Sequence, residues 1–249
     1  MKKLFIALLI CMVGIQMMYA SEQISQSEAE IQIEAQKDLA AILQYSVKYR
    51  FSPDLQVGDK IEYKRIKDPF EETDISIEVT KKDKNGVWIV EKFDDMEIHM
   101  LVDLESMELV DFFGYDEGEI IPDPPLVTKH EMNKRINALN QFKNGLANFG
   151  IPHDWKDNNS HEIMSTKSGT FHCSVLEASL PDEIIEKAGD EKITQELIEK
   201  LKLYFSADVP KMIPFDIAIY AIGSSEVFKN ISGGLVKNDV IEIKDFKKK

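Results

Sequence analysis

The chain has 249 residues, with 30 lysines and arginines against 44 aspartates and glutamates, and its formal net charge is −14. A chain this acidic is a poor electrostatic partner for nucleic acid or anionic lipid, so we expect no nucleic-acid partner. The hydrophobic fraction of 43% excludes a disordered chain, and the length suits one large domain or two small ones.

The N-terminus has the pattern of a secretory signal peptide over residues 1–20. Lys2 and Lys3 precede an uncharged apolar run from Leu4 to Met18, and Ala20 offers a small residue for cleavage. The run is short for a membrane span, although an uncleaved anchor is an alternative interpretation. We expect an exported protein, periplasmic or secreted, with no integral membrane span after the signal is removed.

Amphipathic helices are predicted over residues 24–49 and 128–149, because apolar side chains recur there at helical spacing after hydroxyl–carboxylate capping boxes. The first helix dominates an N-terminal segment, 21–54. Residues 55–249 are expected to form a single β-rich domain that contains the second helix and a charged helical insert at 182–202.

The region between the two helices is predicted to be an antiparallel meander of strands joined by short turns. Apolar and polar side chains alternate along 73–80, the period of a half-buried strand. Asn85-Gly86 is the clearest hairpin signal, because both residues tolerate a positive φ. A loop is expected over 114–127. Strands are predicted at 60–67, 73–80, 87–93, 96–101, 107–113, 162–164, 169–178, 203–206 and 240–246.

Cys173 is the only cysteine left once residues 1–20 are removed, so no intrachain disulfide is expected. It alternates with Phe171 and Val175, which places all three on one strand face. We expect a buried structural thiol, because the surrounding sequence shows none of the basic residues that activate a catalytic one.

Four short motifs occur in order along the β-rich part: Val57-Gly58-Asp59-Lys60-Ile61-Glu62-Tyr63, Gly169-Thr170-Phe171-His172-Cys173, Val209-Pro210 and Gly234-Leu235-Val236-Lys237. This order resembles a group of exported bacterial proteins of unassigned function that read V-G-D-x-V-E-Y, G-T-F-x-C, V-P and G-L-V-K. They in turn resemble the LolA-like lipoprotein carriers. The resemblance implies an α+β fold, a curved antiparallel β-sheet or incomplete β-barrel with helices packed on its open side. It supplies no catalytic residues.

Asp95, Glu97 and His99 alternate along one predicted strand, which would place them on one face. Two carboxylates and an imidazole could bind a divalent metal. Alternation alone also explains the spacing, as the solvent face of a strand whose other face is apolar. No HExxH or paired-cysteine motif accompanies the three residues. We favour the solvent face and expect neither a metal nor a cofactor.

Two apolar regions are candidate ligand sites. Met96, Met100 and Phe113 belong to a methionine-rich and aromatic meander, which could pack as core or line a lumen that accepts an acyl chain. Residues 212–222 are apolar on both strand faces and are flanked by proline and glycine. They form either core or a flap over a ligand. The candidates in this segment are Phe215, Ile217, Ile219 and Tyr220.

The preferred functional hypothesis is a non-enzymatic exported protein that binds an apolar small molecule, a lipid or the lipid moiety of a lipoprotein partner. One alternative is an exported structural or interaction protein with a filled core and no ligand. The other is a metal-dependent hydrolase that uses Asp95, Glu97 and His99. An apolar cavity inside the sheet would favour the first hypothesis, and a filled core the second.

Overall fold

The computed structural model describes residues 28–68, 71–94, 96–116, 118–121, 126–141, 154–179, 202–215, 217, 225–238 and 241–249. Its helices are α2 (Glu28–Arg50), α3 (Lys129–Gln141) and α8 (Ser225–Lys229). Its strands are β1 (Lys60–Asp68), β2 (Glu71–Asp83), β3 (Gly86–Phe93), β4 (Met96–Asp103), β5 (Glu108–Asp116), β6 (Glu119–Ile121), β7 (Asp154–Thr166), β8 (Gly169–Ser179), β9 (Lys202–Ser206), β10 (Gly234–Lys237) and β11 (Ile241–Lys247). The predicted signal peptide and nearly all of the predicted insert at 182–202 lie outside these residues.

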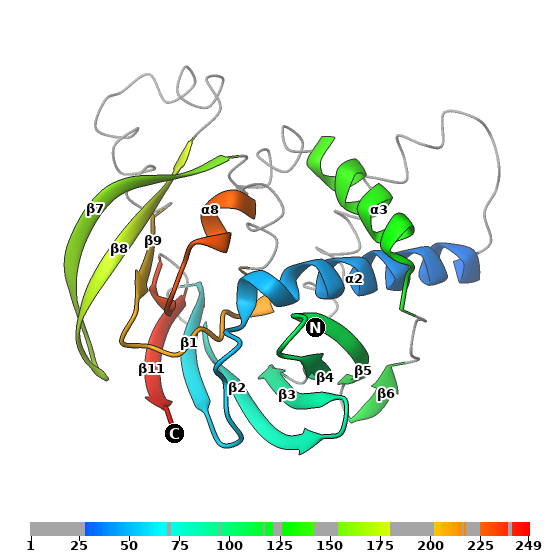
Figure 1. Cartoon of the computed structure of the whole chain (residues 1–249), viewed down its shortest axis with the longest axis horizontal. Coiled ribbons are helices and arrows are strands. Elements are labelled where there is room, and N and C mark those ends of the chain that lie inside the picture. The colour runs from blue at the N-terminus through cyan, green and yellow to red at the C-terminus, as the bar shows by residue number, and fades with distance from the viewer. Residues whose placement is uncertain are drawn as a thin grey trace.

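The described strands form one 11-stranded antiparallel sheet in the order β6-β5-β4-β3-β2-β1-β11-β10-β9-β8-β7. Strands β1 to β5 form the predicted meander, and the last strand pairs with the first. Figure 1 shows the sheet curving around α2, with β7 and β8 on one flank and β5 and β6 on the other. The predicted α+β class with a curved, open antiparallel sheet is confirmed.

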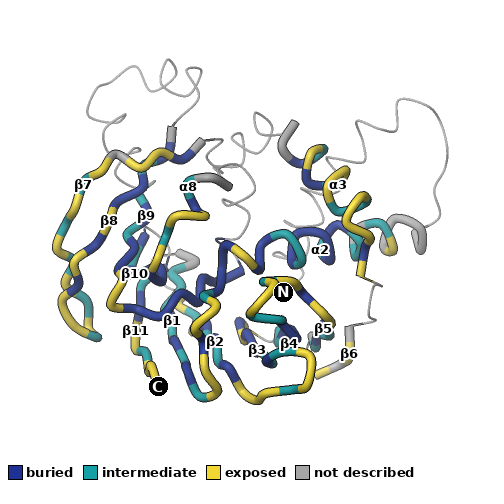
Figure 2. Tube along the Cα trace, viewed as in Figure 1, coloured by how far each residue is buried: buried dark blue, intermediate teal, exposed yellow. Residues whose placement is uncertain are grey.

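Helix α2 lies against the inner face of the curved sheet. Ala40, Leu43 and Val47 of α2 are completely buried, and they belong to the same apolar cluster as Ile77 and Ile89 of the sheet. Figure 2 shows this buried stretch of α2 directly above the buried strands. The predicted helix 24–49 is therefore present over its described part, and the buried residues of that part belong to the core of the protein.

Helix α3 lies on α2 and covers it from outside. Arg135 of α3 contacts three carboxylates, those of Glu34 at 2.8 Å, Asp38 at 2.5 Å and Glu131 at 2.9 Å. The predicted cap is present, since the Glu131 amide donates to Thr128 Oγ1 at 3.2 Å. The predicted continuation over 142–149 lies outside the described residues. None of the described helices combines the length and the apolar character that a membrane span needs.

The turn between β2 and β3 lies one residue earlier than predicted. Asp83 pairs with Gly86, so Lys84 and Asn85 form the loop. Gly86 is needed for another reason, because a Cβ there would lie 2.2 Å from the carbonyl oxygen of Val102 on β4. The glycine therefore permits a close approach of two strands.

From β6 onward the structure differs from the prediction at several elements, including β10, which was not predicted as a strand. Strand β6 forms inside the predicted loop 114–127, and α8 was not predicted. Strand β7 starts at Asp154, eight residues before the predicted start at 162. A bulge between Asp157 and His161, with Asn159 at φ 54°, interrupts the alternation of β7, and this removes the periodic signal on which strand prediction depends.

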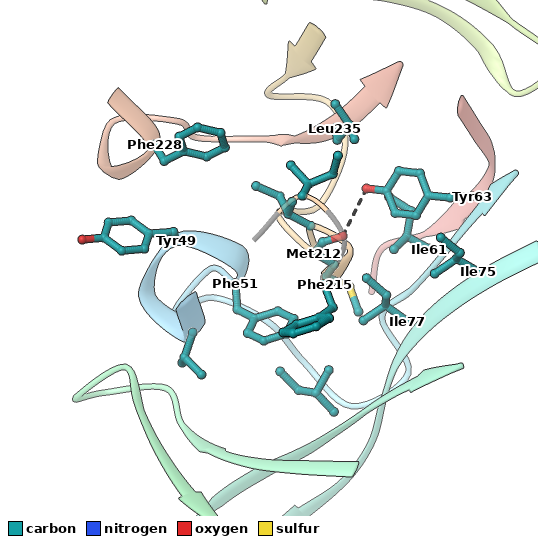
Figure 3. Close-up of a cluster of buried hydrophobic side chains, with 14 of the residues drawn as sticks. Tyr49, Phe51, Ile61, Tyr63, Ile75, Ile77, Met212, Phe215, Phe228 and Leu235 are labelled. Atoms are coloured by element: carbon teal, nitrogen blue, oxygen red, sulfur yellow. Dashed lines mark hydrogen bonds between the residues drawn. The ribbon is translucent and has the colours of Figure 1, made fainter. Parts of the chain in front are cut away.

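The centre of the core lies between the end of α2, strands β1 to β3 and residues 212–215 and 217. Figure 3 shows Met212 and Phe215 among Phe51, Ile77 and the ring of Tyr63. The Tyr63 hydroxyl donates to the carbonyl oxygen of Met212 at 3.1 Å. Burial raises the pKa of Tyr63 well above its ordinary value, so this hydroxyl remains a donor. The described part of the ambiguous segment is core.

Candidate functional site

A groove of about 450 Å³ lies on the outer face of the sheet, opposite α2. Its lining residues alternate along the strands with the buried residues of the inner face, and they therefore face the other way. We call it the outer groove. It is lined by Ser76, Glu78, Thr80, Lys81, Trp88, Val90, Lys92, Glu97, His99 and Phe113.

Strand register arranges the outer groove in three cross-strand rows. Lys81 and Trp88 form the first row. The second contains Glu78, Val90, His99 and Phe113, and the third contains Ser76, Lys92, Glu97 and Tyr115. Residues that pair across neighbouring strands have Cβ atoms about 5 Å apart, so each row is a line of touching side chains.

Aromatic rings form the wall of the middle row. The rings of His99 and Phe113 are stacked with centroids 4.4 Å apart, and Trp88 lies 5.4 Å from Phe113. Tyr115 meets His99 edge to face at 5.7 Å. Aromatic surface that remains open on a groove is a favourable contact for apolar or planar groups of a ligand.

A bulge in β2 places Lys81 beside Trp88. The register shifts between Val79 and Lys81, so Lys81, instead of Thr80, becomes the partner of Trp88. The ammonium nitrogen of Lys81 lies 5.3 Å from the centre of the indole ring, a cation–π distance. Without the bulge, strict alternation would turn Lys81 to the opposite face.

Glu97 and His99 contact each other, and a lysine completes the cluster. His99 Nε2 lies 2.5 Å from Glu97 Oε1, and Lys92 Nζ lies 2.7 Å from Glu97 Oε2. Partial burial raises the pKa of Glu97, but Lys92 and His99 together outweigh it and hold that pKa below its ordinary value. Both carboxylate oxygens of Glu97 therefore already contact a nitrogen of the protein.

The third predicted metal candidate, Asp95, lies outside the described residues. Among the residues that the structure describes, no three histidine, cysteine, aspartate or glutamate side chains gather closely enough to hold a metal ion. The ammonium of Lys92 occupies the side of Glu97 where a cation would bind. Glu97 and His99 lie on the more solvent-exposed face of β4, as the alternation predicted.

The predicted ligand residues lie on different faces of the sheet. Met100 is completely buried on the inner face, and Met96 is half-buried at the edge of the same core. Phe113 lines the outer groove, because an irregular register opposite Leu101 turns Phe112 inward and Phe113 outward. The three residues therefore do not line one common surface.

Phe215 and Ile217, the candidates in the apolar segment, are buried in the core on the inner side of the sheet. The other two candidates there, Ile219 and Tyr220, lie outside the described residues. The described part of this segment therefore lies far from the outer groove, with the sheet between them.

A buried ion pair in the interior was not anticipated from the sequence. Arg50 at the end of α2 and Glu91 of β3 are both about 1% exposed at their side chains and contact each other. Arg50 Nε also donates to the carbonyl oxygen of Ile213 at 2.9 Å, and the Phe215 amide donates to Glu91 at 2.6 Å. One signal was available, since Glu91 falls on the apolar side of the alternation in β3.

The chain matches no protein-family model, no curated protein and no solved structure.

Proposed function

We propose that the protein is an exported, non-enzymatic binding protein that holds the apolar part of a small molecule, or of a partner's lipid moiety, in the outer groove. One observation carries this proposal: a groove of about 450 Å³ with a wall of aromatic rings on the accessible face of a rigid sheet. Small-molecule sites have volumes of about 300–1,000 Å³ and combine apolar walls with a few polar groups.

We propose export on the basis of the amino-acid sequence. The charged and apolar pattern of residues 1–20 supports it, and the LolA-like motif order supports a related architecture. In the fold, the curvature of the sheet around α2 is compatible with an incomplete barrel whose open side carries the helices. We propose this finer architecture together with the function.

The outer groove is a better candidate than the interior of the sheet. The inner face is occupied by the protein itself, since Met100, Phe215 and Ile217 are at most 5% exposed there. The guanidinium of Arg50 lies between Phe51 and Phe215, 4.8 and 5.6 Å from the two ring centres. A ligand in the described part of the interior would have to displace this packing, whereas the outer groove is already open.

The filled interior favours a second candidate function, an exported structural or interaction protein without a ligand. The two candidates differ in one measurable property, which is stoichiometric binding of a small apolar probe. Native mass spectrometry after gentle purification adds a second comparison. A binding protein is expected to retain a bound molecule, whereas the structural alternative predicts the mass of the chain alone.

The test uses N-phenyl-1-naphthylamine, an uncharged apolar fluorophore. We expect saturable binding at one site, and we expect Phe113→Ser to weaken it about tenfold, because the variant removes an apolar wall. Val110→Ser is the matched control, since Val110 is an exposed apolar residue of the same strand outside the groove. If Phe113→Ser binds the probe as tightly as the wild type, the outer groove is not the site.

Occupancy can also be followed inside the groove. The chain has two tryptophans, and only Trp88 lines the groove, so Trp155→Phe leaves a single reporter at the site. We expect the probe to quench the emission of Trp88 with the same midpoint as the rise in probe fluorescence. Quenching without saturation would indicate collisions in solution and contradict a defined site.

A further inference from the structure

We infer that the ligand of the outer groove is an amphipathic anion, whose negatively charged head group binds at the Lys81–Trp88 end while its apolar body lies against Phe113. This inference rests on the proposed function, because it names the chemical class that the same groove selects. It follows from the charges and the hydrogen-bonding groups of the three rows.

The cations of the groove are not equivalent. Lys92 is already neutralised by Glu97 in the third row. Within the described part of the chain, Lys81 has no carboxylate within ion-pair distance, and its contact is the face of the Trp88 ring. Lys81 therefore carries a positive charge with no ion-pair partner among these residues, and this charge attracts an anion.

The second group at this end is the indole N–H of Trp88. Its nitrogen is buried and has no hydrogen-bond acceptor among the residues that the structure describes. A buried donor without an acceptor is costly. Because the nitrogen has almost no accessible surface, a ligand oxygen accepts from it only after a small movement of the side chains around it. An indole nitrogen can only donate, so the missing partner must be an acceptor.

Of the two carboxylates that line the groove, Glu97 is neutralised away from this end. Glu97 is held in the third row by Lys92 and His99. Glu78, in the second row, lies opposite Lys60 of β1 and contributes to raising the pKa of that lysine, whose ion pair is with Glu62 at 2.7 Å. The groove thus has Lys81 at one end, a middle row that combines aromatic rings with Glu78, and an ion-paired far end, so an anionic head group is best placed at Lys81.

The test compares two probes that differ by one charged group. The first is 1-anilinonaphthalene-8-sulfonate, and the second is N-phenyl-1-naphthylamine, which lacks the sulfonate. We expect Lys81→Gln to weaken the anionic probe about tenfold and to leave the neutral probe within about twofold, because only the anion uses the ammonium. Lys82→Gln is the matched control, an exposed neighbour on β2 that does not line the groove, and should change neither affinity.

Trp88→Phe tests the hydrogen bond separately, since phenylalanine keeps an aromatic ring and removes the donor. We expect this variant to weaken the anionic probe more than the neutral one. If Lys81→Gln and Trp88→Phe leave the ratio of the two affinities unchanged, the anion inference is overturned while the proposed binding function stands. If neither probe binds the wild-type protein, the proposed function fails, and the inference fails with it.

Discussion

Lys211 is an amine that the fold buries without a carboxylate partner among the described residues. It is 6% exposed, its Nζ donates to the carbonyl oxygen of Phe228 at 3.5 Å, and burial lowers its pKa from 10.5 to about 8. Between these two pH values the unfolded chain binds more protons than the folded one. The free energy of unfolding should therefore rise with pH through this window.

We predict that Lys211→Met stabilises the protein at pH 7 by about 1–2 kcal/mol, because it removes the cost of a buried charge. The gain should shrink as the pH rises from about 8 toward 10.5, since the wild-type lysine then loses its proton. Thermal melts of both proteins from pH 7 to 10.5 measure the difference. Lys229→Met, at an exposed lysine, is the control. A gain in stability that does not depend on pH would contradict a lowered pKa of Lys211.

Cys173 has the environment that the sequence predicted. Phe171, Cys173 and Val175 are all at most 4% exposed, whereas His172 is exposed. Burial raises the pKa of the Cys173 thiol to about 11, so the reactive thiolate is scarce at neutral pH.

We predict that a thiol reagent labels native Cys173 at least about a hundredfold more slowly than the unfolded chain. The control places the thiol on the other face of the same strand, with Ser174→Cys in a Cys173→Ser background, because Ser174 is exposed. That control should react rapidly in the native state. Equal labelling rates for the two native proteins would show that the face of β8 that carries Cys173 is open to solvent.

At the scale of elements, the Arg50–Glu91 pair joins three parts of the chain that are far apart in sequence. Arg50 ends α2, Glu91 belongs to β3, and both make hydrogen bonds to backbone atoms of the 212–217 segment. A buried pair contributes little net stability relative to apolar residues, but removing one partner leaves a charge buried alone.

We predict that Arg50→Met or Glu91→Leu alone lowers the free energy of unfolding by about 3–5 kcal/mol. The double variant should recover part of this loss, because no isolated charge remains. Recovery should be incomplete, since the Phe215 amide then lacks its acceptor. Urea unfolding of the four proteins gives the coupling energy. Additive losses in the double variant would mean that the two side chains act independently.

The elements that sequence reasoning predicted well are those with uninterrupted periodicity. The β1–β5 meander and α2 keep regular apolar spacing over most of each element despite the shifts in β2 and β5, and their described boundaries agree with the prediction to within a few residues. β7 was recognised only in its second half because its bulge breaks the alternation. The groove was not predicted, since it requires the β2 and β5 register shifts that place Lys81 and Phe113 on one face. A sequence pattern alone does not reveal such shifts.

At the scale of the molecule, the sheet depends on one junction. β11 lies between β1 and β10, so it joins the N-terminal meander to the C-terminal strands. We predict that deletion of residues 241–249 abolishes a single cooperative unfolding transition, because the two groups of strands lose their shared neighbour. Deletion of 248–249 leaves β11 intact and is the control. A truncated chain that still melts in one sharp transition would contradict this view.

The pairing of β1 with β11 also affects the order in which the strands of the sheet can pair during synthesis. Lys60 pairs with Lys247, so the strand that completes the sheet is synthesised long after the β1–β5 meander. The β1–β5 meander can pair its own strands earlier, through short turns, while β1 keeps one edge without a partner. A ribosome-bound chain therefore exposes an unpaired edge until β11 has been synthesised. Such a chain remains a ready substrate for chaperones during that interval, and it reaches its final stability only after β11 has paired.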